Sequence, residues 1–329
     1  MNFYKNKKVL VTGGTGLIGR PLVEMLLEQG AEVRVASLDE PSRANSKTDF
    51  RKVDLTRSEN CLVVCKNIDY VFNLVGSKGS PRMNAEKPAS FFTSTILFNT
   101  NMLEAARQNN VKRYLYTSSV GVYSPAEIFY EDDVWKTSPS ENDRFAGWAK
   151  RMGELQAEAY NIEYGWNEIA IVRPANVYGP YDNFNPLNSM VVPSLIRRAV
   201  EKENPFVVWG NDSTIRDFIH ARDVARGMMI VFERCPGPKH PVNIGSGEGC
   251  SIKKLVDIVL NNASYTPKLI WDDSKPAGDK KRVMDISRAK ALGFEPKISL
   301  EEGIKEVMEW YQENKDLNEG YNVFKNKNE

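Results

Sequence analysis

The sequence has little of what several classes of protein need. Among its 329 residues are two histidines, His220 and His240, and four cysteines with no C-x-x-C pair, so we expect no metal site and no disulfide framework. Lys and Arg number 44 against 43 Asp and Glu, so net charge favours neither nucleic acid nor an anionic membrane as a partner. No apolar run approaches the roughly 20 residues that span a bilayer. No signal peptide precedes the first apolar run, and we expect a cytoplasmic protein with reduced thiols.

The stretch 9–30, VLVTGGTGLIGRPLVEMLLEQG, carries the strongest local motif. A short apolar run is followed by three glycines at G-x-x-G-x-x-G spacing and then by apolar residues at helical spacing. A strand, a glycine turn and a helix form the phosphate-binding turn of a dinucleotide fold, in which the free N–H groups of the helix face the pyrophosphate. The expected cofactor contacts in this turn are Gly13, Gly16, Leu17, Ile18 and Gly19.

The end of the second apolar run, 33–36, bears on the choice between NAD and NADP. An acidic residue at this place holds the adenosine ribose of NAD. The chain has Ser37 and Asp39 here, with Arg43 close behind. Asp39 on the ribose favours NAD, Ser37 and Arg43 on a 2′-phosphate would favour NADP, and a solvated loop charge is the third alternative; we expect NAD, with NADP open. Further cofactor contacts are expected near the ends of the next strands, at Asp54, Leu55 and Leu74.

Apolar runs alternate with amphipathic segments over the first half of the chain. This alternation predicts an α/β fold with a Rossmann-type, doubly wound parallel sheet. Strands are expected at 9–11, 32–36, 53–55, 69–75, 114–117 and 168–172, a loop at 76–88, and long helices at 91–108 and 142–164.

The pattern changes after Pro174. The stretch 180–193 is rich in Pro and Asn, as a substrate loop is, and short helices and strands follow it. We predict a Rossmann domain over 1–173 and about 214–245, and a smaller mixed α/β substrate domain over 174–213 and 246–329. The later helices are expected at 194–202, 255–260 and 300–311, and the later strands at 206–209 and 217–219.

Five ordered segments extend over nearly the whole chain: GGTGLIG, TSSVGVYS, WAKRMGE, RPANVYGP and IRDFIHARDVARG. Together they resemble the extended short-chain dehydrogenase/reductases, the NAD-dependent epimerase/dehydratase family that acts on nucleotide sugars. RPANVYGPYDNFNPLNSMVVPSLIRR and the tail RVMDISRAKALGFEPKISLEEGI are most similar to its GDP-L-fucose synthase group. The resemblance implies an NAD(P)-dependent enzyme that transfers hydride at sugar C4, a nucleotide-sugar substrate that is GDP-linked, and a role in surface polysaccharide synthesis. It also implies a homodimer formed through the two long helices.

The family's proton transfer uses a Ser or Thr, a Tyr and a Lys, with Tyr and Lys one helical turn apart. The resemblance assigns Ser119 to the first role and Lys150 to the last, and makes Lys150 a contact of the nicotinamide ribose. Four residues before Lys150 stands Ala146, which cannot transfer a proton, and its neighbour Phe145 has no hydroxyl either. Four alternatives remain. Another acid, base or water could take the place of the tyrosine, or the chain could bind cofactor and nucleotide sugar without catalysis. The helix could also be locally shifted, or an original Tyr could have been replaced by engineering. The candidate substitute tyrosines are Tyr116, Tyr123 and Tyr178.

A second departure concerns epimerisation. The GDP-L-fucose synthase group uses a Cys and a His as acid and base, and the matching positions here hold Gly121 and Met190. Neither side chain exchanges a proton, so redox chemistry at one carbon is expected rather than 3,5-epimerisation. A 4,6-dehydratase stays an alternative, because four acids follow Tyr123: Glu127, Glu131, Asp132 and Asp133.

The substrate side of the motif set is better matched. A diphosphate needs positive charge, and Arg supplies paired donors. The resemblance assigns Arg216 and Arg282 to the diphosphate, Asn176 to the phosphate or sugar, Val192 to the wall of the base and Ser119 to the reacting oxygen. A catalytically inactive nucleotide-sugar or dinucleotide binding protein is the second class of function that the sequence leaves open.

Overall fold

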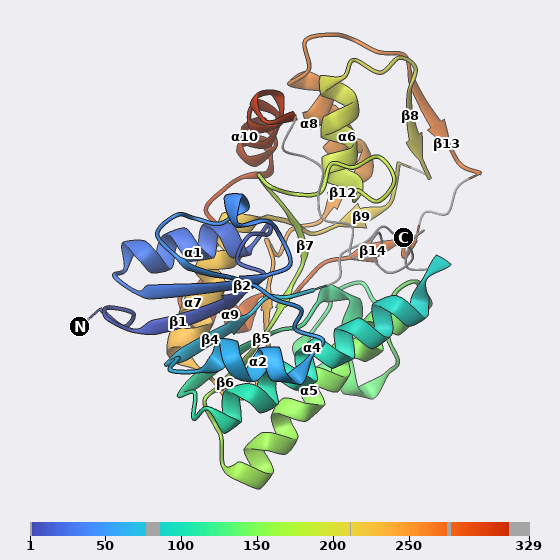
Figure 1. The fold of residues 1–329 in the computed structure, drawn as a ribbon. Coiled ribbons are helices and arrows are strands. Elements are labelled where there is room, and N and C mark those ends of the chain that lie inside the picture. Colours follow the sequence, from blue (N-terminus) through green and yellow to red (C-terminus); the bar gives the residue numbers. More distant parts are fainter. Residues whose placement is uncertain (1, 77–85, 211, 275–277, 316–329) are drawn as a thin grey trace.

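The computed structural model describes residues 2–76, 86–210, 212–274 and 278–315. A seven-stranded sheet lies at the centre, with strand order β3-β2-β1-β4-β5-β6-β11 and every neighbouring pair parallel (Figure 1). This order confirms the predicted Rossmann-type sheet. The strands are β1 (Lys8–Thr12), β2 (Glu32–Ser37), β3 (Asp49–Lys52), β4 (Tyr70–Asn73), β5 (Arg113–Thr117), β6 (Ile169–Pro174) and β11 (Val242–Ile244).

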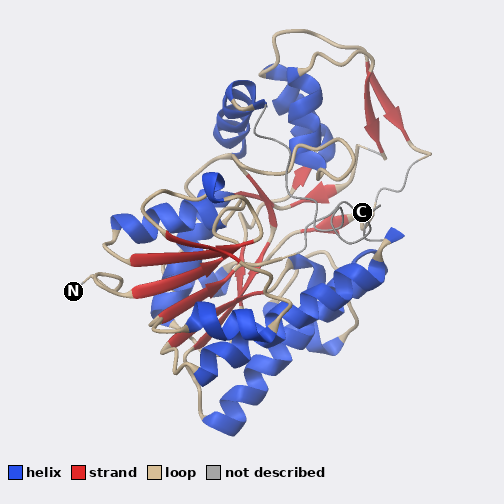
Figure 2. Ribbon diagram, viewed as in Figure 1, coloured by secondary structure: helices blue, strands red, loops and turns tan. Residues whose placement is uncertain are grey.

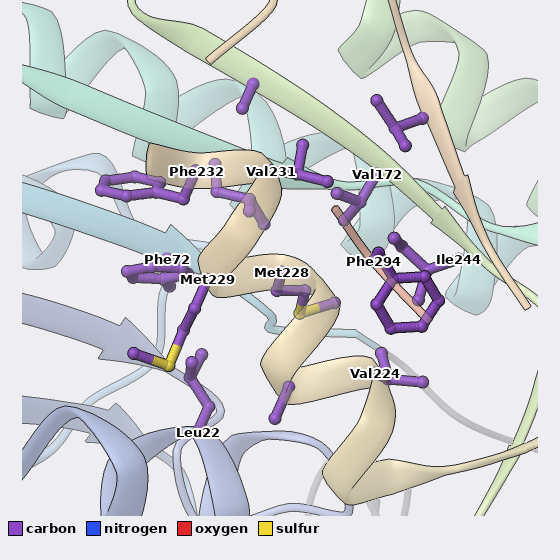
Figure 3. Close-up of a cluster of buried hydrophobic side chains, with 14 of the residues drawn as sticks. Leu22, Phe72, Val172, Val224, Met228, Met229, Val231, Phe232, Ile244 and Phe294 are labelled. Atoms are coloured by element: carbon purple, nitrogen blue, oxygen red, sulfur yellow. The ribbon is translucent and has the colours of Figure 1, made fainter. Parts of the chain in front are cut away.

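Helices cover both faces of this sheet (Figure 2). Alternate residues of β1 therefore enter different cores, Val9 and Val11 on one side and Leu10 on the other, which explains the continuous apolar run. On the first side Phe72 of β4 stacks on Phe232, with ring centroids 4.2 Å apart (Figure 3). The first side is covered by α1 (Gly19–Glu28), α7 (Ala221–Arg234) and α9 (Ser287–Ala291), the second by α2 (Ser58–Cys65), α4 (Pro88–Gln108) and α5 (Arg144–Tyr164).

Several predicted elements differ from the structure. The strand predicted at 53–55 is wrong, because β3 precedes it at Asp49–Lys52. This edge strand reads DFRK and is largely exposed, so it lacks the apolar signal that favoured the neighbouring VDL. The helices α2 and α7 were not predicted at all. The predicted loop 76–88 falls mostly on residues 77–85, which lie outside the described residues.

Other segments of the second half of the chain build a smaller unit above the sheet in Figure 1. Its helices pack around a third core that includes Leu195, Leu255 and Ile304. Met284 and Phe294 instead join the first core beside the sheet, so the predicted domain boundaries remain predictions. The elements are β7 (Asn176–Tyr178), α6 (Val191–Val200), β8 (Phe206–Trp209), β9 (Ile215–Arg216), β10 (Phe218–His220), β12 (Cys250–Ser251), α8 (Ile252–Asn261), β13 (Leu269–Asp272), β14 (Lys281–Arg282) and α10 (Leu300–Glu313).

The described part of the chain contains no helix with both the length and the apolarity of a membrane span. The four cysteines are unpaired. Within the same ranges no group of His, Cys, Asp or Glu side chains is arranged to hold a metal ion.

Candidate active site

The glycine turn joins β1 to α1 at the carboxyl end of the sheet. Gly13 has φ +65°, and a Cβ added to Gly19 would stand 2.2 Å from the carbonyl oxygen of Gly13, so side chains are excluded where the turn folds on itself. Ile18, the N-cap of α1, makes no capping hydrogen bond, and no acidic residue lies in the first helical turn. The first N–H groups of α1 therefore fit an incoming pyrophosphate.

The predicted ribose contacts lie against this turn. The Thr15 hydroxyl donates to the Asp39 carboxylate at 2.5 Å and lies 2.9 Å from the Ser37 hydroxyl. Arg43 ends a short 3-10 turn, and its carbonyl oxygen accepts a hydrogen bond from Arg20. A carboxylate at this position can accept hydrogen bonds from ribose hydroxyls and would repel a 2′-phosphate.

The remaining predicted cofactor contacts differ in their surroundings. Leu74 borders the glycine turn, because its carbonyl oxygen lies 3.3 Å from the position of a Cβ on Gly13. The Asp54 carboxylate accepts hydrogen bonds from the N–H and the hydroxyl of Thr56. Leu55 is buried in the second core. Their contacts with a cofactor stay predictions.

The opposite end of the expected cofactor site lies where α5 crosses the loop after β5. A Cβ on Gly147 would stand 2.3 Å from the carbonyl oxygen of Gly121, so the helix rests directly on this loop. The Lys150 ammonium donates to the carbonyl oxygen of Thr117 at 2.8 Å, and the Ser119 hydroxyl accepts from the N–H of Gly121. The predicted pair Ser119 and Lys150 therefore lies at the same end of β5. Burial of its ammonium lowers the pKa of Lys150 to about 8, against an opposing effect of Glu154.

The structure places the three candidate tyrosines in the core. The Tyr116 hydroxyl donates to the carbonyl oxygen of Lys150, and Tyr123 donates to Asn243, while burial raises the pKa of both phenols. Tyr178 is also buried and has a raised pKa. None of the three is therefore placed to replace the tyrosine missing at Ala146.

The acids after Tyr123 are also engaged elsewhere. Glu127, Asp132 and Asp133 form ion pairs with Lys281, Arg288 and Lys136, respectively. Glu131 is buried and accepts a hydrogen bond from the N–H of Asn243. These contacts describe a structural role for the segment and do not support the dehydratase alternative.

A buried ion pair that the sequence did not predict holds α5 to the sheet. Arg173 of β6 pairs with Glu154 of α5 at 2.7 Å, and both side chains are almost fully buried. The Ser118 hydroxyl donates to the same carboxylate at 2.5 Å. The available signal was the position of Glu154, one helical turn after Lys150 on the same face of the helix.

The two predicted phosphate arginines lie side by side. β14 pairs with β9 in a parallel register that aligns Arg282 with Arg216. Arg282 forms ion pairs with Asp143, at 2.6 Å, and with Asp279. Burial and the neighbouring Arg282 lower the pKa of Arg216 to about 10. Asp143 and Asp279 were not predicted, since single acids in polar loops give no specific signal.

The other predicted substrate residues take part in the fold. The Asn176 side chain donates to the carbonyl oxygen of Asp217 at 2.9 Å. Val192 lies in the third core, on α6. Their contacts with a substrate stay predictions.

Comparison with known proteins agrees with this geometry. Residues 9–245 match the model of the NAD dependent epimerase/dehydratase family. The chain belongs to this family. It is 33% identical to GDP-L-fucose synthase 1 of Arabidopsis thaliana, over 94% of both chains. It is 29% identical to GDP-L-fucose synthase of Escherichia coli, over 94% of this chain and 98% of that one. It also resembles the solved UDP-glucose 4-epimerase of Thermotoga maritima with UDP-glucose, at 26% identity and a TM-score of 0.84, over 93% and 99% of the two chains.

Membership in the NAD dependent epimerase/dehydratase family makes NAD(P) the cofactor of this site. The nicotinamide ring of this cofactor accepts or returns a hydride. The residues predicted to hold it are the glycine turn at the pyrophosphate, Asp39 at the adenosine ribose and Lys150 at the nicotinamide ribose, and these roles stay predictions.

The pKa of Lys150 gives a testable pH dependence. With a pKa of about 8, below that of free lysine, the ammonium is present below pH 8 and is lost above it. If the ammonium holds the nicotinamide ribose, affinity for NAD falls as pH rises through 8, by up to about tenfold per pH unit. Calorimetric titration with NAD from pH 6 to 9.5 measures this. A Lys150→Met control should bind weakly with no such fall; a wild-type affinity that is constant over this range would contradict the assignment.

The place of Asp39 gives a prediction for cofactor choice. Asp39→Asn removes the charge that would repel a 2′-phosphate, so the ratio of the NADP to the NAD dissociation constant should fall by about tenfold. Glu40→Gln is the matched control, because Glu40 is exposed and pairs with Lys52. Titration with both cofactors measures the ratio. An unchanged ratio in Asp39→Asn would show that Asp39 does not contact the ribose.

Proposed function

We propose that this protein modifies a nucleotide sugar by NAD(P)-dependent hydride transfer at sugar C4, and that a group other than the usual tyrosine transfers the proton. The observation that carries the proposal is the convergence of Ser119 and Lys150 at the end of β5, over which α5 lies in direct contact. A hydroxyl and an ammonium at that point serve the reacting oxygen and the cofactor ribose.

The neighbouring arginines support a diphosphate-bearing substrate. Arg216 and Arg282 bring two guanidinium groups together, beside the loop that carries Ser119. Two acids, Asp143 and Asp279, form ion pairs with Arg282. A nucleoside diphosphate can replace these carboxylates as a partner of Arg282. We further propose GDP as the nucleotide, on the likeness to the GDP-L-fucose synthases.

Ala146 favours a second candidate function, a nucleotide-sugar binding protein without turnover. In that case Ser119, Lys150 and the arginine pair would hold ligands only. A 4,6-dehydratase is less well supported, because the acids after Tyr123 are engaged in ion pairs or buried contacts.

Mass spectrometry separates these functions. The protein is incubated in heavy water with NAD or NADP and a panel of GDP-, UDP- and dTDP-hexoses. Loss of about two mass units indicates oxidation at one carbon, loss of about eighteen indicates dehydration, and gain of deuterium indicates exchange beside a keto group. We expect oxidation or its reversal for a GDP-sugar, and no turnover in Lys150→Met. Sugars that all return unchanged, from protein that binds cofactor, would support the binding-protein function.

We also propose a homodimer formed through α4 and α5. Four apolar side chains of α5 are well exposed at spacings of 7, 3 and 7 residues, which places them along one stripe of the helix. They are Phe145, Met152, Leu155 and Ile162, with exposed fractions between 36% and 70%. Leu97 of α4 is 41% exposed and adds to this apolar surface.

The unpaired cysteines support a reducing compartment. We place the reaction in the cytoplasm, where it would supply a sugar for surface polysaccharide.

Charge on this stripe should abolish the dimer. The double variant Leu155→Asp/Ile162→Asp should sediment as a folded monomer in analytical ultracentrifugation, because four like charges would face each other across a two-fold axis. Val63→Asp is the matched control, since Val63 is 68% exposed but lies on α2. A wild-type monomer, or a double variant that stays dimeric, would contradict this arrangement.

A further inference from the structure

Asp143 and the hydroxyl of Ser119 both lie close to Gly121. A Cβ built on Gly121 would stand 3.4 Å from both Cβ and Cγ of Asp143, and 3.5 Å from Oγ of Ser119. The carboxyl group and the hydroxyl therefore flank the same point. Gly121 leaves that point empty of side-chain atoms. The acid is also partly accessible, with 27% of its side chain exposed.

The carboxyl group of Asp143 does not cap a helix. Asp143 ends the 3-10 turn Glu141–Asp143 that leads into α5, and the Ser140 side chain caps this turn. The Asp143 side chain makes no capping hydrogen bond to α5. One oxygen instead lies 2.6 Å from Arg282. The turn before α5 thus presents a carboxylate to Arg282, near the loop that carries Ser119.

The position along α5 matches the missing group. Asp143, Ala146 and Lys150 are spaced by three and four residues, which places them on one face of a helix, within successive turns. Ala146 is thus flanked on this face by Asp143 on one side and Lys150 on the other. The Asp143 carboxylate therefore lies on the same face as position 146, where the family has its tyrosine.

We propose that Asp143 is the proton-transferring group of this site, in the role that Ala146 cannot fill. This inference rests on the proposed function. In the oxidative direction the C4–H bond breaks and its electron pair leaves as hydride to nicotinamide. The O–H bond breaks, its proton passes to the Asp143 carboxylate, and the C4=O double bond forms. In the reductive direction the same proton returns to the oxygen.

The ion pair with Arg282 links this step to the substrate. Arg282 contacts both Asp143 and Asp279, and it is also a predicted partner of the diphosphate. A diphosphate that takes over Arg282 weakens the hold of this arginine on the Asp143 carboxylate. Binding of the nucleotide at Arg282 thereby frees the Asp143 carboxylate to act on the sugar.

The test compares four variants with wild type, using GDP-mannose, UDP-glucose and dTDP-glucose with NAD, read by absorbance at 340 nm. Asp143→Asn should lower kcat by at least about 100-fold, the usual scale of general acid–base catalysis, with KM within about threefold of wild type. Asp279→Asn removes the other acid that pairs with Arg282, and that also accepts from Ser140 and Asn142, but keeps the Asp143 carboxylate, so it should change KM rather than kcat. Asp133→Asn, at an exposed acid paired with Lys136, should match wild type. Adding Ala146→Tyr to Asp143→Asn should restore turnover at least about tenfold.

A binding measurement accompanies the kinetics. Calorimetric affinity of cofactor-free Asp143→Asn for the same three nucleotide sugars should equal or exceed that of wild type, since Arg282 loses a competing carboxylate. Lower affinity together with a lower melting temperature would assign Asp143 a structural role and overturn the inference. Turnover of Asp143→Asn within about threefold of wild type, or an equal loss of kcat in Asp279→Asn, would overturn it while the proposed function stands. Wild-type protein that turns over none of the three sugars would contradict the proposed function itself, and the inference with it.

Discussion

The buried ion pair between Glu154 and Arg173 is the interaction on which the geometry of the site depends. It joins α5 to β6, and Ser118 donates to the same carboxylate. Lys150 lies one turn before Glu154, and Ser119 follows Ser118, so a single contact fixes both groups relative to each other. Removing one partner would leave a buried charge unpaired, at a cost of about 3–5 kcal/mol, and would shift the helix that carries the site.

Two close glycine contacts complete this constraint. Gly147 rests on the carbonyl oxygen of Gly121, and a Cβ on Gly153 would stand 2.3 Å from the ring of Tyr116. Because α5 lies so close to β5 and the loop after it, the Lys150 ammonium reaches the carbonyl oxygen of Thr117, two residues before Ser119. The same approach leaves the region around Ala146 near two charged groups from one helix, Asp143 and Lys150. We therefore expect these two groups, and not the buried tyrosines whose hydroxyls are bound within the fold, to serve the chemistry that the tyrosine would perform.

The sequence contained most of the fold and part of the site. The strand–glycine–helix motif and alternating apolar runs predicted the parallel sheet, because such strands are buried on both faces and their pattern is local. The exposed strand β3 and the helix α2 lacked that pattern and were missed or misplaced. Ser119 and Lys150 could be found from motif spacing. The ion pair of Glu154 with Arg173, and the contacts of Asp143, join segments far apart in the chain, and a single sequence gives no pairing signal for them.

We propose that hydride leaves sugar C4 at a site where α5 carries no tyrosine. The most direct measurement is single-turnover absorbance at 340 nm, after mixing protein and NAD with the nucleotide sugar that the mass spectrometry panel identifies, carrying hydrogen or deuterium at C4. We expect NADH to form with a primary isotope effect of about two or more. Without the tyrosine the proton acceptor is weaker, so breaking of the C4–H bond should limit the rate. NADH formed at equal rates from both sugars would contradict rate-limiting hydride transfer at C4, and no NADH at all would contradict the redox function.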